Sequence, residues 1–215
     1  MIGDKLVITE YHRSAAADIF EKLSVKLTQA KKPLVVTVAG ESGCGKSETA
    51  AVLAELCENA GYKALLLQQD DYFHYPPKTN HQKRLEDISW VGPQEVKLEL
   101  IEENIDTVVK SLKTEITKPL VDYDRDLILE EKVPADGVKV VIVEGTYTTI
   151  IKNADLKTFI DRNYHQTKKA RLKRSRDLLT GFLEKVLSIE HEIISAHKAH
   201  SDIIIPPPDH EVEMG

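Results

Sequence analysis

Short apolar runs alternate with longer segments of helical periodicity along most of this chain. The apolar runs are rich in Val, Ile and Leu and have the length of strands buried on both faces; they cover residues 34–39, 64–67, 138–143, 156–161 and 202–205. Helices are predicted at residues 14–29, 46–59, 93–116, 166–179 and 182–200. Buried strands separated by helices are typical of a parallel sheet covered on both faces, so the pattern predicts the α/β class.

Helix-capping and helix-breaking residues set the expected ends of three helices. Ser14 is predicted to cap the first helix, and Gly61 to end the second in a left-handed conformation. Pro93 suits the first turn of the third helix, whose apolar positions continue at helical spacing to Ile116. Pro119 is then expected to stop that helix.

Composition and charge narrow the class of protein. The 215 residues are 41% hydrophobic and 30% charged, which excludes a disordered chain and predicts a single domain over residues 1–215. A formal net charge of -6 argues against a partner that is nucleic acid or an anionic membrane. Cys44 and Cys57 form neither a disulfide framework nor a zinc-ligand spacing. Because no signal peptide or membrane-length apolar run occurs, we expect a cytoplasmic protein. The sequence leaves open whether the chain forms a homo-oligomer.

The segment GESGCGKS at residues 40–47 follows the first predicted strand and opens the next helix. It matches the G-x-x-x-x-G-K-[ST] phosphate loop in the strand–loop–helix context that supports the motif. Glycines let backbone N–H groups curl around phosphates, Lys46 reaches the outer phosphates, and the Ser47 hydroxyl can ligate Mg²⁺. We therefore expect a nucleoside triphosphate site formed by Gly40, Glu41, Ser42, Gly43, Cys44, Gly45, Lys46, Ser47 and Glu48.

Several classes of phosphate-loop protein lack support in this chain. The Asn-Lys-x-Asp and Asp-x-x-Gly motifs of GTP-dependent switches are absent, as is the Ser-Gly-Gly signature of transporter ATPases. A compact kinase acting on a small molecule is the leading hypothesis. A nucleotide-dependent regulatory switch or binding module is the alternative from another class. A kinase for a sugar or a cofactor precursor would differ only in its acceptor.

Further segments follow the phosphate loop in a characteristic order. They are QQDDYF at residues 68–73, Glu144-Gly145, the basic segment RLKRSRD at 171–177 and SDIIIP at 201–206. Together with the loop they resemble the uridine kinase and phosphoribulokinase family over about residues 34–206. The resemblance implies a P-loop kinase fold with a five-stranded parallel sheet. It also implies a helical acceptor-side segment at about 72–118 and a small helical arginine lid at about 166–181.

The same resemblance implies an activity and its main carboxylates. ATP and Mg²⁺ would be used to transfer the γ-phosphate to an alcohol group of a small metabolite, such as a nucleoside. Asp70 matches the family's aspartate that orients the acceptor hydroxyl and accepts its proton, with Asp71 as the alternative if the register shifts by one. Glu144 matches a carboxylate that acts on Mg²⁺, so Ser47, Asp70 and Glu144 are the expected metal-site residues.

The basic run supplies the remaining expected catalytic groups. Arg171 and Arg174 lie three residues apart and would share one face of a lid helix. In the family such a lid neutralises charge on the transferring phosphoryl group. The expected catalytic set is therefore Lys46, Asp70, Arg171 and Arg174; which arginine touches the phosphates is left open.

The acceptor side departs from the family pattern. Where uridine kinases have Asn-Phe-Asp-His-Pro, residues 89–93 read SWVGP, so Val91 replaces the aspartate. Where they have Pro-x-Tyr-Asp, residues 119–122 read PLVD, so Val121 replaces the tyrosine. A site that hydrogen-bonds a hydroxyl discriminates strongly, so the loss of two polar groups favours an acceptor other than uridine.

Overall fold

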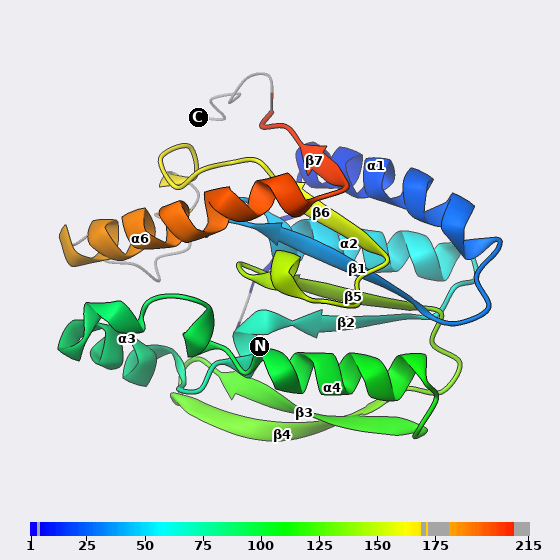
Figure 1. The fold of residues 1–215 in the computed structure, drawn as a ribbon, viewed down its shortest axis with the longest axis horizontal. Coiled ribbons are helices and arrows are strands. Elements are labelled where there is room, and N and C mark those ends of the chain that lie inside the picture. The colour runs from blue at the N-terminus through cyan, green and yellow to red at the C-terminus, as the bar shows by residue number, and fades with distance from the viewer. Residues whose placement is uncertain (4, 169–170, 172–180, 209–215) are drawn as a thin grey trace.

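A computed structural model of residues 1–215 describes the chain except residues 4, 169–170, 172–180 and 209–215. Its main sheet has five strands in the order β2-β5-β1-β6-β7, and every neighbouring pair is parallel (Figure 1). These strands are β1 (Leu34–Gly40), β2 (Ala64–Gln68), β5 (Val140–Gly145), β6 (Leu156–Ile160) and β7 (Ile203–Ile205). The predicted α/β fold with a five-stranded parallel sheet is therefore confirmed.

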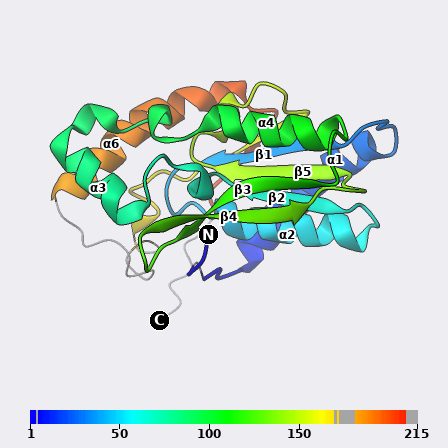
Figure 2. The same ribbon diagram turned by 90° about the horizontal axis from the view of Figure 1, so that it is seen from below.

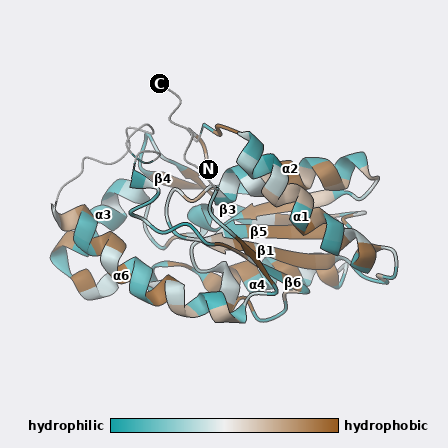
Figure 3. Cartoon of the chain, turned by 90° about the horizontal axis from the view of Figure 1, so that it is seen from above, coloured by the Kyte–Doolittle hydropathy of each residue, from teal (hydrophilic) through white to brown (hydrophobic). Residues whose placement is uncertain are grey.

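Helices cover both faces of this sheet. The α-helices of the described residues are α1 (Glu10–Leu27), α2 (Lys46–Asn59), α3 (Pro77–Glu86), α4 (Leu98–Val109) and α6 (Gly181–His197), and all but α3 contribute to the two hydrophobic clusters against the sheet. Figure 2 shows α2 on one side of the sheet and α4 on the other. The side chains of β1 alternate between two hydrophobic clusters: Val36 packs with α1 and α2, whereas Val35 packs with α4 and α6. Both faces of the strand are thus buried, which explains its continuous apolar sequence (Figure 3).

The N-terminal helix begins earlier than predicted. The backbone N–H of Thr9 donates to Nδ1 of His12 at 3.0 Å, and the helix starts at Glu10. Ser14 therefore lies inside the helix and does not cap it.

The predicted helix from Pro93 to Ile116 is wrong at both ends. Residues Pro93–Glu95 form one 3₁₀ turn, and α4 runs only from Leu98 to Val109. Ser111 then takes a left-handed φ of 50°, which a helix cannot continue through. Ile116 and Pro119 lie on a strand instead, because Ile116 is buried there by packing with distant residues.

That strand belongs to an antiparallel pair that the sequence analysis did not predict. β3 (Glu115–Asp122) pairs with β4 (Leu127–Pro134), so the segment after residue 114 is sheet rather than helix. The pair lies beyond the edge strand β2 and beside α4 (Figure 1). No helix within the described residues is long and apolar enough to span a membrane.

Candidate active site

The phosphate loop joins the end of β1 to the start of α2. Gly43 and Gly45 have φ values of 74° and 102°, a region that glycine enters without strain. A Cβ on Gly40 would lie 2.8 Å from the carbonyl oxygen of Ile160, so the close approach of β6 also requires glycine. Gly45 is the N-cap of α2 and has no side chain to bond the first turn. The N–H groups at this helix end suit a phosphate, so the loop fits the predicted nucleotide.

Lys46 and Ser47 point to different partners. Lys46 Nζ donates to the carbonyl oxygen of Glu41 at 2.9 Å, which keeps the ammonium beside the loop. Ser47 Oγ donates to Glu144 Oε1 at 3.1 Å. Gln68 Nε2 donates to the same oxygen at 3.4 Å. The loop is thereby joined to the carboxyl ends of β5 and β2, where ligands of parallel α/β sheets bind.

Negative charge gathers around the loop. Burial and the charge of nearby Asp70 together raise the pKa of Glu144 to about 7, although the charge of Lys46 opposes the shift. Burial opposes the charge of Lys46 as well, but its pKa is raised because four groups nearby favour the ammonium: Cys44, Glu144, Asp70 and Glu190. An additional cation would relieve the repulsion between the carboxylates.

Mg²⁺ suits this donor set. No group of three His, Cys, Asp or Glu side chains arranged for a metal occurs among the described residues. Mg²⁺ does not need one, because it usually takes one or two protein oxygens and completes its shell with phosphates and water. A hydroxyl at Ser47 and carboxylates at Glu144 and Asp70 fit that requirement.

The structure separates the two neighbouring aspartates. Asp71 is fully buried; its Oδ2 accepts from Lys118 Nζ at 2.9 Å and its Oδ1 from the backbone N–H of Val121 at 2.9 Å. Asp71 therefore fastens β3 to the turn that follows β2. Asp70 is exposed at the same turn, and its charge acts on Glu144. Of the two, Asp70 is the one that a ligand can reach.

The described part of the predicted lid rests on the phosphate loop. Arg171 is 4% exposed, and its Nη1 donates to the carbonyl oxygen of Tyr164 at 2.7 Å and to Thr167 Oγ1 at 2.6 Å. Thr167 Oγ1 donates in turn to the carbonyl oxygen of Ser42 at 2.9 Å. A Cβ on Gly43 would meet Arg171 Cγ at 2.8 Å. Arg174 and most of the predicted lid, residues 169–170 and 172–180, lie outside the described residues.

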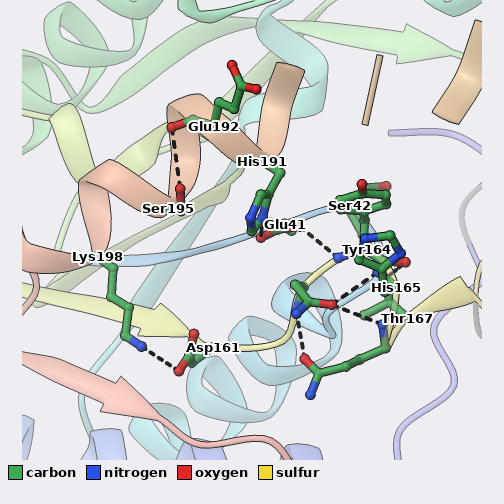
Figure 4. Close-up of polar contacts among 12 residues, drawn as sticks. Glu41, Ser42, Asp161, Tyr164, His165, Thr167, His191, Glu192, Ser195 and Lys198 are labelled. Atoms are coloured by element: carbon green, nitrogen blue, oxygen red, sulfur yellow. Dashed lines mark hydrogen bonds and ion pairs between the residues drawn. The ribbon is translucent and has the colours of Figure 1, made fainter. Parts of the chain in front are cut away.

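Glu41 connects the loop to two other segments. Its Oε2 accepts from the backbone N–H of Tyr164 at 2.7 Å, and its Oε1 lies 2.7 Å from His191 Nδ1. Figure 4 shows His191 reaching from α6 toward Glu41. The sequence predicted Glu41 only as a member of the loop and did not identify His191, because the two residues are 150 positions apart.

Sequence reasoning also missed an ionic network beside the loop. Arg84 Nη2 donates to Glu95 Oε2 at 2.8 Å and to Glu190 Oε1 at 2.9 Å. Asn80 Nδ2 donates to Glu95 Oε1 at 3.0 Å, and Glu95 is fully buried. Glu190 also raises the pKa of Lys46, so the network borders the phosphate loop. These residues come from separate segments of the chain, and no local sequence motif predicts that they meet.

The phenol of Tyr147 lies close enough to this network to feel its charges. Its side chain is 1% exposed, and its hydroxyl has no hydrogen-bond partner within the part of the chain that the structure describes. Burial raises the pKa of Tyr147 well above its usual value, and the charges of Glu190 and Glu95 raise it further. The phenol therefore stays protonated.

Comparison with known proteins decides the family. Residues 35–180 match the model of the Phosphoribulokinase / Uridine kinase family. The chain belongs to this family. The predicted kinase, a phosphotransferase acting on an alcohol group of a small molecule, is thereby confirmed.

Individual relatives agree with this assignment. The chain is 25% identical over 187 residues to the uridine kinase of Leuconostoc citreum, covering 81% of this chain and 88% of that enzyme. It is 25% identical over 189 residues to the bifunctional alpha-galactosidase/sucrose kinase of Mediterraneibacter gnavus, covering 82% of this chain but only 20% of that protein. The solved phosphoribulokinase from Rhodobacter spheroides has the same fold, with a TM-score of 0.63 at 14% identity, covering 82% of this chain and 71% of that one.

Proposed function

We propose that this kinase transfers the γ-phosphate of Mg-ATP to a hydroxyl group of a small, uncharged, polyhydroxylated metabolite. The observation that carries this proposal is the junction of the phosphate loop with Glu144 and Asp70 at one edge of the sheet. The loop and the first turn of α2 would hold the phosphates through backbone N–H groups and Lys46. Ser47, Glu144 and Asp70 would hold Mg²⁺, which when bound neutralises charge on the outer phosphates.

Asp70 is the residue that we assign to the acceptor. As the acceptor oxygen bonds to the γ-phosphorus, its proton passes to the Asp70 carboxylate. The bond from the γ-phosphorus to the bridging oxygen breaks, and ADP leaves with the electron pair. Because the transition state is loose, Asp70 acts chiefly by aligning the hydroxyl. Arg174, like Arg171, stays a predicted lid residue that would neutralise charge on the moving phosphoryl group.

The charges around Tyr147 support an uncharged acceptor. Arg84 is already held by the carboxylates of Glu95 and Glu190, so an anionic acceptor would have to displace a buried partner. Because one guanidinium serves both carboxylates, it is not available to pair with a phosphate or carboxylate on the acceptor. Hydroxyl groups suit the same surroundings, because they donate to carboxylates and accept from the Tyr147 phenol.

The named relatives include enzymes of this type. Uridine and sucrose, the acceptors in two of their names, are uncharged and rich in hydroxyl groups. Val91 and Val121 are 4% and 0% exposed, and neither side chain can hydrogen-bond a ribose. A nucleoside acceptor would thus depend on other groups, such as Glu190 and Tyr147, and a sugar is the second member of the same class.

A panel of acceptors tests the proposal. ADP formation from Mg-ATP is measured with uridine, cytidine, sucrose and fructose, and with the anions glycerate and ribulose 5-phosphate; Lys46→Ala is the blank. We expect at least one uncharged acceptor to accelerate ADP formation and the anions to have no effect. Acceleration by the anions alone would contradict the acceptor class. Slow ATP hydrolysis that no acceptor changes would contradict transfer and favour the regulatory switch.

A further inference from the structure

The N-terminal helix α1 precedes the residues that match the family, yet it contacts the phosphate loop. The family match begins at residue 35, whereas α1 ends at Leu27. A Cβ on Gly45 would lie 2.5 Å from His12 Nε2, so the imidazole ring covers the loop glycine that caps α2. Tyr11 precedes His12 and makes its own contacts at the carboxyl edge of the sheet.

The order of the strands shows where the base of a bound nucleotide would lie. Asp70 follows β2 and Glu144 lies near the carboxyl end of β5, so the acceptor and the terminal phosphate belong on that side of β1. The phosphate loop follows β1, and β6 and β7 lie on the opposite side. A nucleotide held along its phosphates by the loop would therefore place its base over the ends of β6 and β7. Arg162 follows β6, and Pro206 follows β7.

Tyr11 contacts both of these residues. Its hydroxyl donates to the carbonyl oxygen of Pro206 at 3.0 Å. The Arg162 guanidinium carbon lies 5.3 Å from the centre of the Tyr11 ring, within the range of a cation–π contact. Arg162 Nη1 also donates to the carbonyl oxygen of Cys44 in the phosphate loop, at 3.5 Å. Partial burial raises the pKa of Tyr11 despite the opposing charge of Arg162, so the phenol remains a donor.

We propose that Tyr11 is a positioning residue for the nucleotide base. Its ring holds the guanidinium plane of Arg162 from one side, so that the other side is presented to the base as a stacking surface. The proposal rests on the proposed function in one respect, that the phosphate donor is a nucleotide. Planar guanidinium groups stack on any base, because every base has a π-face. Tyr11 should accordingly support ATP and GTP to a similar extent.

Inorganic tripolyphosphate separates this role from a structural one, because it occupies the phosphate loop and has no base. Dissociation constants for Mg-ATP, Mg-GTP and Mg-tripolyphosphate are measured by calorimetry for the unchanged protein, Tyr11→Leu, Tyr11→Phe and Arg162→Ala. Tyr11→Leu keeps an apolar side chain for packing, and Tyr11→Phe keeps the ring but not the hydroxyl. Val25→Ala, at an exposed position of the same helix, is the control.

We expect Tyr11→Leu and Arg162→Ala to weaken both nucleotides about tenfold. Tripolyphosphate affinity should change less than about twofold, and Tyr11→Phe should keep most of the nucleotide affinity. Unchanged nucleotide binding by Tyr11→Leu, or an equal loss for nucleotide and tripolyphosphate, would overturn the proposal. An unchanged protein that binds neither nucleotide nor tripolyphosphate would overturn the proposed function and this proposal with it.

Discussion

Ser47 and Glu144 lie 97 residues apart in the chain and meet through a hydrogen bond of 3.1 Å. One belongs to the loop that would hold phosphate, and the other is the penultimate residue of the neighbouring strand β5. The parallel pairing of β1 with β5 brings the two together, since both strands end at the same edge.

Glu144→Gln keeps an acceptor for the Ser47 hydroxyl but removes the negative charge. If Glu144 acts on Mg²⁺, the concentration of Mg²⁺ required for half-maximal activity should rise about 10- to 100-fold. The metal-free protein should become more stable to heat, because a buried charge beside Asp70 is lost. Activity measured against Mg²⁺ concentration, with a thermal melt in EDTA, checks both effects. An unchanged Mg²⁺ requirement would exclude the metal role.

The neighbouring aspartates should respond differently to the same substitution. Asp70→Asn should lower kcat about 100-fold or more and leave stability nearly unchanged, because Asp70 is exposed. Asp71→Asn should cost about 2 kcal/mol of unfolding free energy, because it weakens the buried contacts to Lys118 and the Val121 N–H. Urea unfolding of both variants measures the change in stability, and steady-state kinetics measures the change in kcat. The reverse pattern would assign the acceptor to Asp71.

Tyr147→Phe tests the proposed contact between the phenol and the acceptor. The Tyr147 hydroxyl has no partner among the described residues, so its loss should leave the unfolding free energy within about 0.5 kcal/mol. The KM of the acceptor should rise about tenfold while the KM of ATP stays constant. A change confined to the KM of ATP would place the phenol on the donor side.

Arg84→Met should instead destabilise the fold by about 3 kcal/mol, because Glu95 and Glu190 lose their shared cation.

Two glycines with similar backbone conformations provide a matched pair. Gly43 has a φ of 74° and Gly61 a φ of 83°, so alanine is strained at either position by about 1 kcal/mol. A Cβ at Gly61 meets nothing within 4 Å, whereas a Cβ at Gly43 lies 2.8 Å from Arg171 Cγ. Gly43→Ala should therefore abolish measurable Mg-ATP binding, and Gly61→Ala should retain it. Equal binding by the two variants in a calorimetric titration would show that the loop tolerates a side chain.

Local patterns predicted what local forces determine. The strand β1 and the phosphate loop follow from a continuous apolar run and from fixed glycine spacing, and both lie where expected. The prediction that a helix continues to Ile116 was wrong, because apolar residues can occur at helical spacing by chance. Burial against distant residues makes Ile116 part of β3. The contacts of Arg84 with Glu95 and Glu190 join three separate segments. Only the folded chain brings such residues together, so no periodicity predicts them.

The hydrogen bond between Glu41 and Tyr164, just before the predicted lid, affects how variants of that segment should be interpreted. The same side chain holds the backbone of Tyr164 and the ring of His191, and Thr167 bonds the next residue of the loop, Ser42. The described start of the predicted lid is thus bonded to the loop that would hold the phosphates. A substitution there displaces that loop even when the altered side chain never meets ATP. Weakened donor affinity in such a variant reports the geometry of the loop, and direct contact has to be established separately.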